Sequence, residues 1–170
     1  MRNGLSAGAR GGVLGLAAME LVKRLTRPII RERAPEPMDV FPAARSMSVI
    51  GPRHEPDESA TDALGRIAYT RVVGHRPSPN ATRLLSWGVH IGYGLLVATV
   101  YGLVRARRAR RHVVRDGVIF GTGLWLFGDE LVVPLLGLQD KPNAYHPTRH
   151  LHSLLAHLGF GITTAAAAQR

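Results

Sequence analysis

The sequence contains no cysteine among its 170 residues, which excludes disulfide bonds and thiolate metal sites. Acidic residues are scarce: 12 Asp and Glu stand against 22 Lys and Arg, so the formal net charge is +10. Aromatic residues make up only 6% of the chain. A basic balance can indicate a nucleic-acid partner, but the arginine-rich stretch lacks the interleaved aromatic side chains on which single-strand binders stack bases. We therefore expect no nucleic-acid partner.

Charge is also nearly missing from long apolar stretches. Four such stretches cover residues 5–24, 84–104, 117–138 and 150–168. The last three contain no Asp, Glu, Lys or Arg apart from Asp129 and Glu130, whereas the first is less apolar and bears Glu20. Each has close to the 20 residues with which a helix crosses a hydrocarbon core of roughly 30 Å. The sequence therefore predicts an all-α integral membrane protein with four spans in a single membrane domain.

A short basic link separates the second apolar stretch from the third. Its arginines include Arg105, Arg107, Arg108, Arg110 and Arg111. Short basic loops stay cytoplasmic and face anionic lipid headgroups, so we expect these arginines to bind lipid and both termini to be cytoplasmic. Residues 25–83 then form a long outer loop. The basic residues at and just beyond the end of the first stretch oppose this orientation: Lys23, Arg24, Arg27, Arg31 and Arg33.

The outer loop divides into an irregular half and a helical half. Its first half is interrupted by six prolines, which favour extended or irregular backbone: Pro28, Pro35, Pro37, Pro42, Pro52 and Pro56. Apolar residues then recur at helical spacing, which predicts an amphipathic helix over residues 62–73 on the membrane or on the bundle. Ser59 and Asp62 have the spacing of a helix-start capping pair. Asn80 is expected to cap the span that follows.

A short motif occurs twice in the apolar stretches. Residues 90–95 read His-Ile-Gly-Tyr-Gly-Leu, and residues 157–162 read His-Leu-Gly-Phe-Gly-Ile. Glu-Leu-Val precedes each copy, at residues 20–22 and 130–132. The order predicts a four-helix bundle of two repeated hairpins. Small residues four apart let helix backbones approach closely in lipid, and they occur at Gly11 and Gly15, Gly88 and Gly92, Gly117 and Gly121, and Gly161 and Ala165.

If the two hairpins run in register, their ionisable residues lie at similar depth in the outer half of the bundle, since each helical residue rises about 1.5 Å. This candidate polar layer consists of Glu20, His90, Asp129, Glu130, His150 and His157. Pro134 frees a backbone carbonyl near Glu130, which either adds a polar ligand or bends the helix. Ionisable groups at membrane depth are costly and often mark function.

Several interpretations of this layer stay open. A Glu and a His on neighbouring helices can lock the helix register without chemistry, or exchange protons or bind ions near neutral pH. His90, Glu130 and His157 would suit zinc or iron, although no local motif such as His-Glu-x-x-His supports a metal. Haem held between His90 and His157 is a further alternative.

The second hairpin carries a pattern that resembles a known family. From Gly117 it reads Gly-x3-Gly-x3-Trp, then Asp-Glu-Leu-Val-x-Pro-Leu-x-Gly-Leu over residues 129–138, then Pro142, His150 and His157. This is similar to the YagU-type bacterial inner-membrane proteins, a family of uncharacterised function. The Gly-rich first helix and the basic, Pro-containing segment after it also fit. The resemblance implies a multi-pass protein of the bacterial inner membrane, and it supplies no reaction, cofactor or active site.

The sequence thus predicts a membrane protein whose biochemical activity it does not identify. The first functional hypothesis is a proton- or ion-responsive protein linked to pH or envelope stress. The second is a metal- or haem-binding membrane enzyme, although an enzyme is not favoured. The third is a non-catalytic interaction protein that uses the outer loop. The sequence is silent on assembly, so a homo-oligomer is left open.

Overall fold

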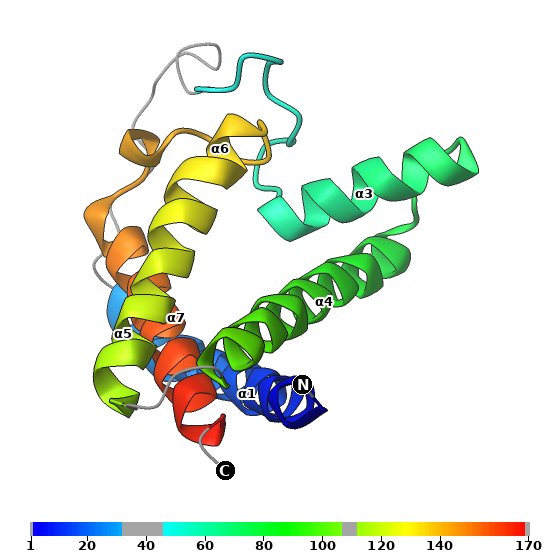
Figure 1. The fold of residues 1–170 in the computed structure, drawn as a ribbon. Coiled ribbons are helices and arrows are strands. Elements are labelled where there is room, and N and C mark those ends of the chain that lie inside the picture. The colour runs from blue at the N-terminus through cyan, green and yellow to red at the C-terminus, as the bar shows by residue number, and fades with distance from the viewer. Residues whose placement is uncertain (1, 32–45, 107–111, 169–170) are drawn as a thin grey trace. The chain divides into compact units, whose positions relative to one another are not determined.

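The computed structural model describes residues 2–31, 46–106 and 112–168. Within these ranges every regular element is helical, which confirms the predicted all-α class (Figure 1). The elements are α1 (Arg2–Arg31), α3 (Ala60–Val73), α4 (Pro79–Arg105), α5 (Val113–Gly123), the π-helix η1 (Leu124–Val132), α6 (Val133–Leu135), the 3₁₀ turn η2 (Pro142–Ala144) and α7 (Pro147–Ala167).

Three segments of the described chain are long and apolar enough to cross a membrane: Gly4–Ile30, Pro79–Arg105 and Val113–Leu135. They contain the predicted spans 5–24 and 84–104 and most of the span 117–138. The first helix runs beyond its predicted end at residue 24, because α1 continues through Pro28 to Arg31. The first residues of the expected outer loop, residues 25–31, therefore belong to a helix.

The fourth predicted span, residues 150–168, corresponds to α7, which is not among the three membrane-capable segments found in the described chain. Its mean hydropathy is lowered by Arg149, by three histidines and by several Ser, Thr and Gly residues. It is also well covered by protein, because Ala156, Phe160 and Thr164 are buried. A helix enclosed by other helices has less need of an apolar surface, so the fourth crossing stays a prediction.

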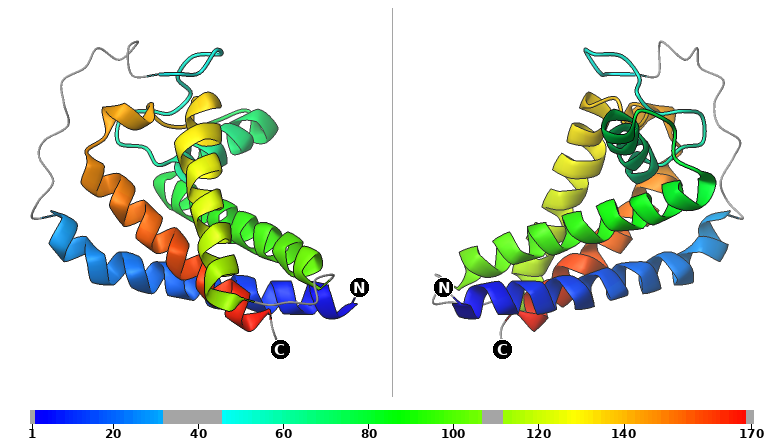
Figure 2. Two further views of the ribbon diagram at one scale, coloured as in Figure 1. Left: turned by 60° about the vertical axis from the view of Figure 1, so that its left-hand side comes forward. Right: turned by 90° about the vertical axis from the view of Figure 1, so that its right-hand side faces the viewer.

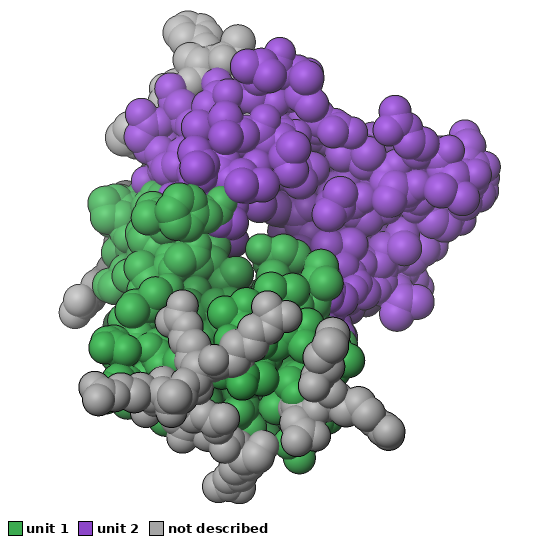
Figure 3. Space-filling view, viewed as in Figure 1, with its two compact units in different colours: residues 1–36, 93–127, 146–170 green, residues 37–92, 128–145 purple. Residues whose placement is uncertain are grey.

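The chain divides into two compact units (Figure 3). Unit one consists of residues 1–36, 93–127 and 146–170, and unit two consists of residues 37–92 and 128–145. Unit one therefore contains α1, α5, α7 and the second half of α4. Unit two contains α3, the first half of α4, α6 and the turn η2.

In unit one, α7 packs against both α1 and α5 through glycine contacts (Figure 2). On α1, Gly11 and Gly15 face Thr164 and Phe160, and the Thr164 hydroxyl donates a 3.1 Å hydrogen bond to the Gly11 carbonyl. On α5, Gly117 lies so close to α7 that a Cβ there would be 2.5 Å from the Ile162 Cα. The small residues predicted at these positions do permit close backbone approach.

The large apolar side chains of the same helices point outwards. A small central cluster contains Met19, Ala98, Ala156 and Phe160. Leucine, valine, isoleucine and phenylalanine occupy the outer surface instead, as at Leu14, Leu25, Leu96, Val100, Ile119 and Phe127. This arrangement of glycine and alanine inside and large apolar residues outside reverses the pattern of a water-soluble bundle.

The two copies of the repeated motif differ in their packing. The second glycine of each copy is buried: Gly94 faces the Leu16 side chain, and Gly161 faces the backbone of Gly121. The aromatic residue between the glycines is buried in one copy, Phe160, and exposed in the other, Tyr93. Among the described residues no atom comes within 4 Å of a Cβ built at Gly88 or Gly92. That glycine pair therefore makes no close helix contact here.

The third span changes its helical register before Pro134. The π-helix η1 follows α5, and in a π-helix the N–H of a residue bonds the carbonyl five positions earlier. Pro134 has no N–H to donate. In an α-helix this would leave the carbonyl of Glu130, four positions earlier, without its bond. In the π-helical register it leaves the carbonyl of Asp129, five positions earlier. The Gln139 side-chain amide donates to the Asp129 carbonyl at 2.5 Å. The freed carbonyl is thus satisfied within the protein.

In unit two, local capping fixes where the helices begin and end. The predicted capping contact is confirmed, because the Asp62 N–H donates to the Ser59 hydroxyl oxygen at 3.2 Å at the start of α3. Gly74 ends α3 in the left-handed conformation, with φ of 85°. The cap expected at Asn80 was wrong: α4 starts at Pro79, and the Ala81 N–H donates to the Ser78 hydroxyl oxygen. Proline suits the first helical position, where no N–H partner is required.

Candidate functional site

The six residues of the predicted polar layer are divided between the two units. Unit one holds Glu20, His150 and His157, and unit two holds His90, Asp129 and Glu130. All six are partly buried. Their convergence in one layer therefore stays a prediction, and the contacts below are described within each unit.

In unit one, two residues of the layer have partners on their own helix. The Lys23 ammonium donates to the Glu20 carboxylate at 2.9 Å, one turn further along α1. The His157 Nδ1 lies 2.9 Å from the Ser153 carbonyl, to which a protonated Nδ1 donates. His152, which is not part of the layer, lies 3.3 Å through its Nε2 from the Lys23 carbonyl on α1. His152 therefore links α7 to α1.

In unit two, the Trp87 and His90 rings form an edge-to-face contact with centroids 6.2 Å apart. Asp129 and Glu130 lie in the π-helix η1. The described part of the chain gathers no group of three or more histidine, aspartate or glutamate side chains that could hold a metal ion. The zinc, iron and haem interpretations remain predictions.

One arginine of the basic link has a protein partner. Arg105, the last residue of α4, is buried and contacts Asp116 of α5 at 2.7 Å. Asp116 also accepts from the His112 backbone N–H at 3.2 Å. The charge of Arg105 is therefore paired inside unit one, and its expected contact with lipid headgroups stays a prediction. The other four arginines of the expected headgroup site, Arg107, Arg108, Arg110 and Arg111, lie outside the described residues.

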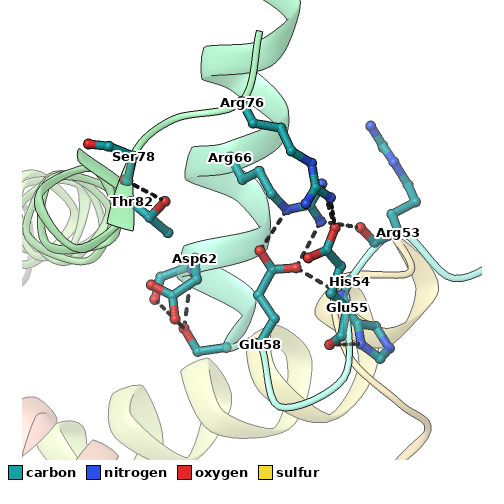
Figure 4. Close-up of polar contacts among 11 residues, drawn as sticks. Arg53, His54, Glu55, Glu58, Asp62, Arg66, Arg76, Ser78 and Thr82 are labelled. Carbon is teal, nitrogen blue, oxygen red and sulfur yellow. Dashed lines mark hydrogen bonds and ion pairs between the residues drawn. The ribbon is translucent and has the colours of Figure 1, made fainter. Parts of the chain in front are cut away.

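The best-defined polar site lies in unit two and centres on Arg66 of α3 (Figure 4). The Arg66 Nε and a terminal nitrogen donate to the two carboxylate oxygens of Glu58 at 2.7 and 2.8 Å. The same terminal nitrogen donates to the Arg53 carbonyl at 2.8 Å. Glu55 contacts Arg76 and lies 3.9 Å from Arg66. The arginine thus joins α3 to the loop before it through a bidentate ion pair, the strong form of this interaction.

The charges of this pair shift each other's titration. Burial alone would raise the pKa of Glu58, but the hydrogen bond and charge of Arg66 and the Glu55 backbone contact together hold that pKa below its ordinary value. The hydrogen bond to Glu58 raises the pKa of Arg66, against the opposing effect of burial. The pair is therefore fully charged at neutral pH.

A histidine–carboxylate contact lies beside this cluster. The His54 Nε2 faces the Asp140 Oδ1 at 3.4 Å, and the two side chains are only 13% and 19% exposed. The other ring nitrogen, Nδ1, lies 3.2 Å from the Glu55 carbonyl. A carbonyl only accepts, so when Nδ1 donates to it the neutral ring leaves Nε2 without a proton in front of a carboxylate. A second proton on Nε2 turns this contact into an ion pair.

Backbone contacts hold the same loop to the end of the third span. The Gly137 carbonyl accepts from the Arg53 and His54 N–H groups at 2.8 and 3.1 Å. Gly137 has φ of 71°, a conformation that glycine adopts without strain, and the Gly51 carbonyl packs against its Cα. The Asp140 N–H donates to the Tyr145 hydroxyl oxygen at 3.1 Å. Residues 51–55 are therefore docked on residues 137–140.

Sequence reasoning missed both polar contacts of unit two. Glu58 and Arg66 lie eight residues apart across a helix start, and no helical spacing pairs them. His54 and Asp140 are far apart in the sequence. No protein-family model, curated protein or solved structure matches the chain.

Proposed function

We propose that the chain is a multi-pass protein of the bacterial inner membrane whose outer loop responds to protons. The packing of unit one carries the first half of this proposal. Glycine and alanine line its helix contacts while large apolar side chains cover its surface, and contiguous exposed apolar surface on that scale is unfavourable in water. The resemblance of residues 117–161 to the YagU-type family supports the inner membrane as the location.

Membrane integration has a direct test. We expect the protein to stay in the membrane fraction after alkaline carbonate extraction and to leave it only with detergent. The cysteine-free sequence allows single cysteines to be added at exposed positions. Asn143→Cys should react with an impermeant maleimide in intact cells, and Arg115→Cys only after lysis, because the proposed orientation places them on opposite sides. Release by carbonate, or the reverse labelling pattern, would contradict the proposal.

The contact between His54 and Asp140 carries the second half. Histidine is the side chain whose ordinary charge change falls in the physiological pH range. The charged groups next to the contact along the two segments are Arg53, Glu55 and Lys141. Because the contact becomes an ion pair only when Nε2 is protonated, acid strengthens the docking of residues 51–55 on residues 137–140. This agrees with the hypothesis of a protein linked to pH or envelope stress.

Hydrogen exchange measures this docking. After correction for intrinsic rates, we expect amides 51–55 to exchange more slowly at about pH 6 than at about pH 8. A partly exposed ion pair contributes about 1 kcal/mol or less, so the slowing should be at most about fivefold. Asp140→Asn should remove it, because a side-chain amide can donate to the bare Nε2 of the neutral ring. Asp57→Asn, which changes an exposed carboxylate of the same loop, is the matched control. An unchanged pH response in Asp140→Asn would rule out this contact as the sensor.

A further inference from the structure

The loop docked on Gly137 has an unusual tip. Residues 48–51 form a turn, closed by a 3.3 Å hydrogen bond from the Gly51 N–H to the Ser48 carbonyl, and the turn presents Val49 and Ile50. Val49 is 96% exposed and Ile50 is 62% exposed. Two adjacent large apolar side chains at the tip of an ordered turn contribute little to the protein's own packing. Contact with lipid or with another partner would bury them.

The position of the tip indicates which partner. Gly137, on which the loop is docked, directly follows Leu135 and Leu136 at the end of the third membrane-capable helix, and both leucines are exposed. In a protein that crosses the membrane, these leucines face lipid, and the helix end lies at the interface between acyl chains and headgroups. The docked loop therefore holds Val49 and Ile50 near the same level. Exposed apolar side chains thus occur both at the end of the span and on the loop that is docked there.

We infer that the Val49–Ile50 tip inserts into the lipid interface and anchors the outer loop to the bilayer; this inference rests on the proposed membrane function. The occupant of the apolar tip is bilayer lipid, because the loop that carries the tip is docked on the residue that follows the exposed leucines at the end of the span. Arg53 supplies a cation beside the tip, and its side chain extends away from the Glu58 cluster in Figure 4. A basic residue next to an inserted apolar pair is attracted by lipid phosphate.

Site-specific depth measurement tests the inference. Val49→Cys and Ile50→Cys are each labelled with a nitrobenzoxadiazole thiol dye, and the full-length protein is reconstituted in phosphatidylethanolamine–phosphatidylglycerol vesicles. Nitroxide lipids then quench the dye from a shallow or a deep position. Interfacial apolar segments lie about 5–10 Å deep, so we expect quenching at least about twice as strong by the shallow nitroxide as by the deep one.

Two control positions separate this inference from the membrane function itself. Pro56→Cys lies in the same loop and is exposed, so its dye should remain in water and be quenched little. Leu96→Cys lies midway along the second span, so its dye should be quenched most by the deep nitroxide. If Leu96 reports deep lipid while Val49 and Ile50 behave like Pro56, the tip does not insert and only this inference fails. A dye at Val49 that is shielded from water but not quenched by lipid indicates a protein partner and also overturns it. If Leu96 is not quenched, the membrane function fails as well.

Discussion

Gly161→Ala is expected to lower the stability of the detergent-solubilised protein by about 2 kcal/mol, since overpacking a close helix contact costs about 1–3 kcal/mol. A Cβ at this position would lie 2.8 Å from the Cα and 2.7 Å from the backbone nitrogen of Gly121. Backbone atoms cannot move aside as a side chain can, so α5 and α7 must separate. The helical preference of alanine over glycine offsets only about 0.5–1 kcal/mol of this loss.

The repeated motif provides matched controls for this substitution. In the other copy, Gly94→Ala places its Cβ 2.6 Å from a Leu16 methyl group, which can rotate, so a smaller loss is expected. Gly92→Ala meets no described atom within 4 Å and should be neutral or slightly stabilising, because alanine is the better helix former. Thermal unfolding followed by circular dichroism in detergent gives the ranking. Equal midpoints for Gly161→Ala and Gly92→Ala would show that α5 and α7 do not meet at this glycine.

This ranking also marks the limit of what glycine spacing predicts. The spacing identified Gly11, Gly15, Gly117, Gly121 and Gly161 correctly as residues of close helix contacts. The same spacing at Gly88 and Gly92 accompanies no close neighbour in the described structure. Spacing places small residues on one face of a helix, whereas the partner of that face depends on the tertiary arrangement. Sequence reasoning could therefore predict the faces but not which of them are used.

The helical class and three membrane-capable segments were predictable, because apolar runs of this length leave few alternatives. The polar residues of α7 could not be interpreted from the sequence alone. Because α7 packs against both α1 and α5, its histidine and threonine side chains are partly or fully covered by protein. The π-helix was not predictable from the position of Pro134 alone. Proline indicates that a carbonyl is freed, but the register decides that it belongs to Asp129.

The candidate site was predicted less well, because its contacts join residues that are far apart in the sequence or on different elements. Glu20 was predicted to lie in a layer with residues of other helices, and the nearby Lys23 on its own helix pairs with it. The polar contacts that define unit two join a loop to a helix start and to the end of a distant span. Hydrophobic periodicity carries no information on such contacts.

Arg66→Met should release the loop over residues 53–58 in unit two. The substitution removes both hydrogen bonds to Glu58 and the bond to the Arg53 carbonyl, and it leaves a largely buried carboxylate without its cation. Breaking a fully buried pair costs about 3–5 kcal/mol; the partial exposure of these side chains lowers the expected loss to about 2 kcal/mol. Faster hydrogen exchange of these amides, with unit one unchanged, is the expected result.

Two further variants separate charge from geometry. Arg66→Lys keeps the charge but cannot form the bidentate contact, so it should fall between the wild type and Arg66→Met. The double variant Arg66→Met with Glu58→Leu removes the stranded carboxylate and should recover much of the loss. If the double variant is as damaging as the sum of its single changes, the two side chains do not interact, and the ion pair does not hold the loop.

The pH profile of the loop provides an independent check on the same pair. Because Arg66 holds the pKa of Glu58 below its ordinary value of 4.5, the unfolded state binds more protons than the folded state as the medium is acidified. The stabilisation is therefore complete above that value and is lost as pH falls through the lower pKa of the folded state. In Arg66→Met, burial and the charge of Asp62 raise the pKa of Glu58, and only the Glu55 backbone N–H still lowers it. Glu58 is then no longer held below its ordinary pKa, so the acid release of the loop should disappear; it is measured in an Asp140→Asn background so that the second carboxylate does not contribute. An identical acid profile in the wild type and Arg66→Met would mean that Arg66 does not set the charge of Glu58.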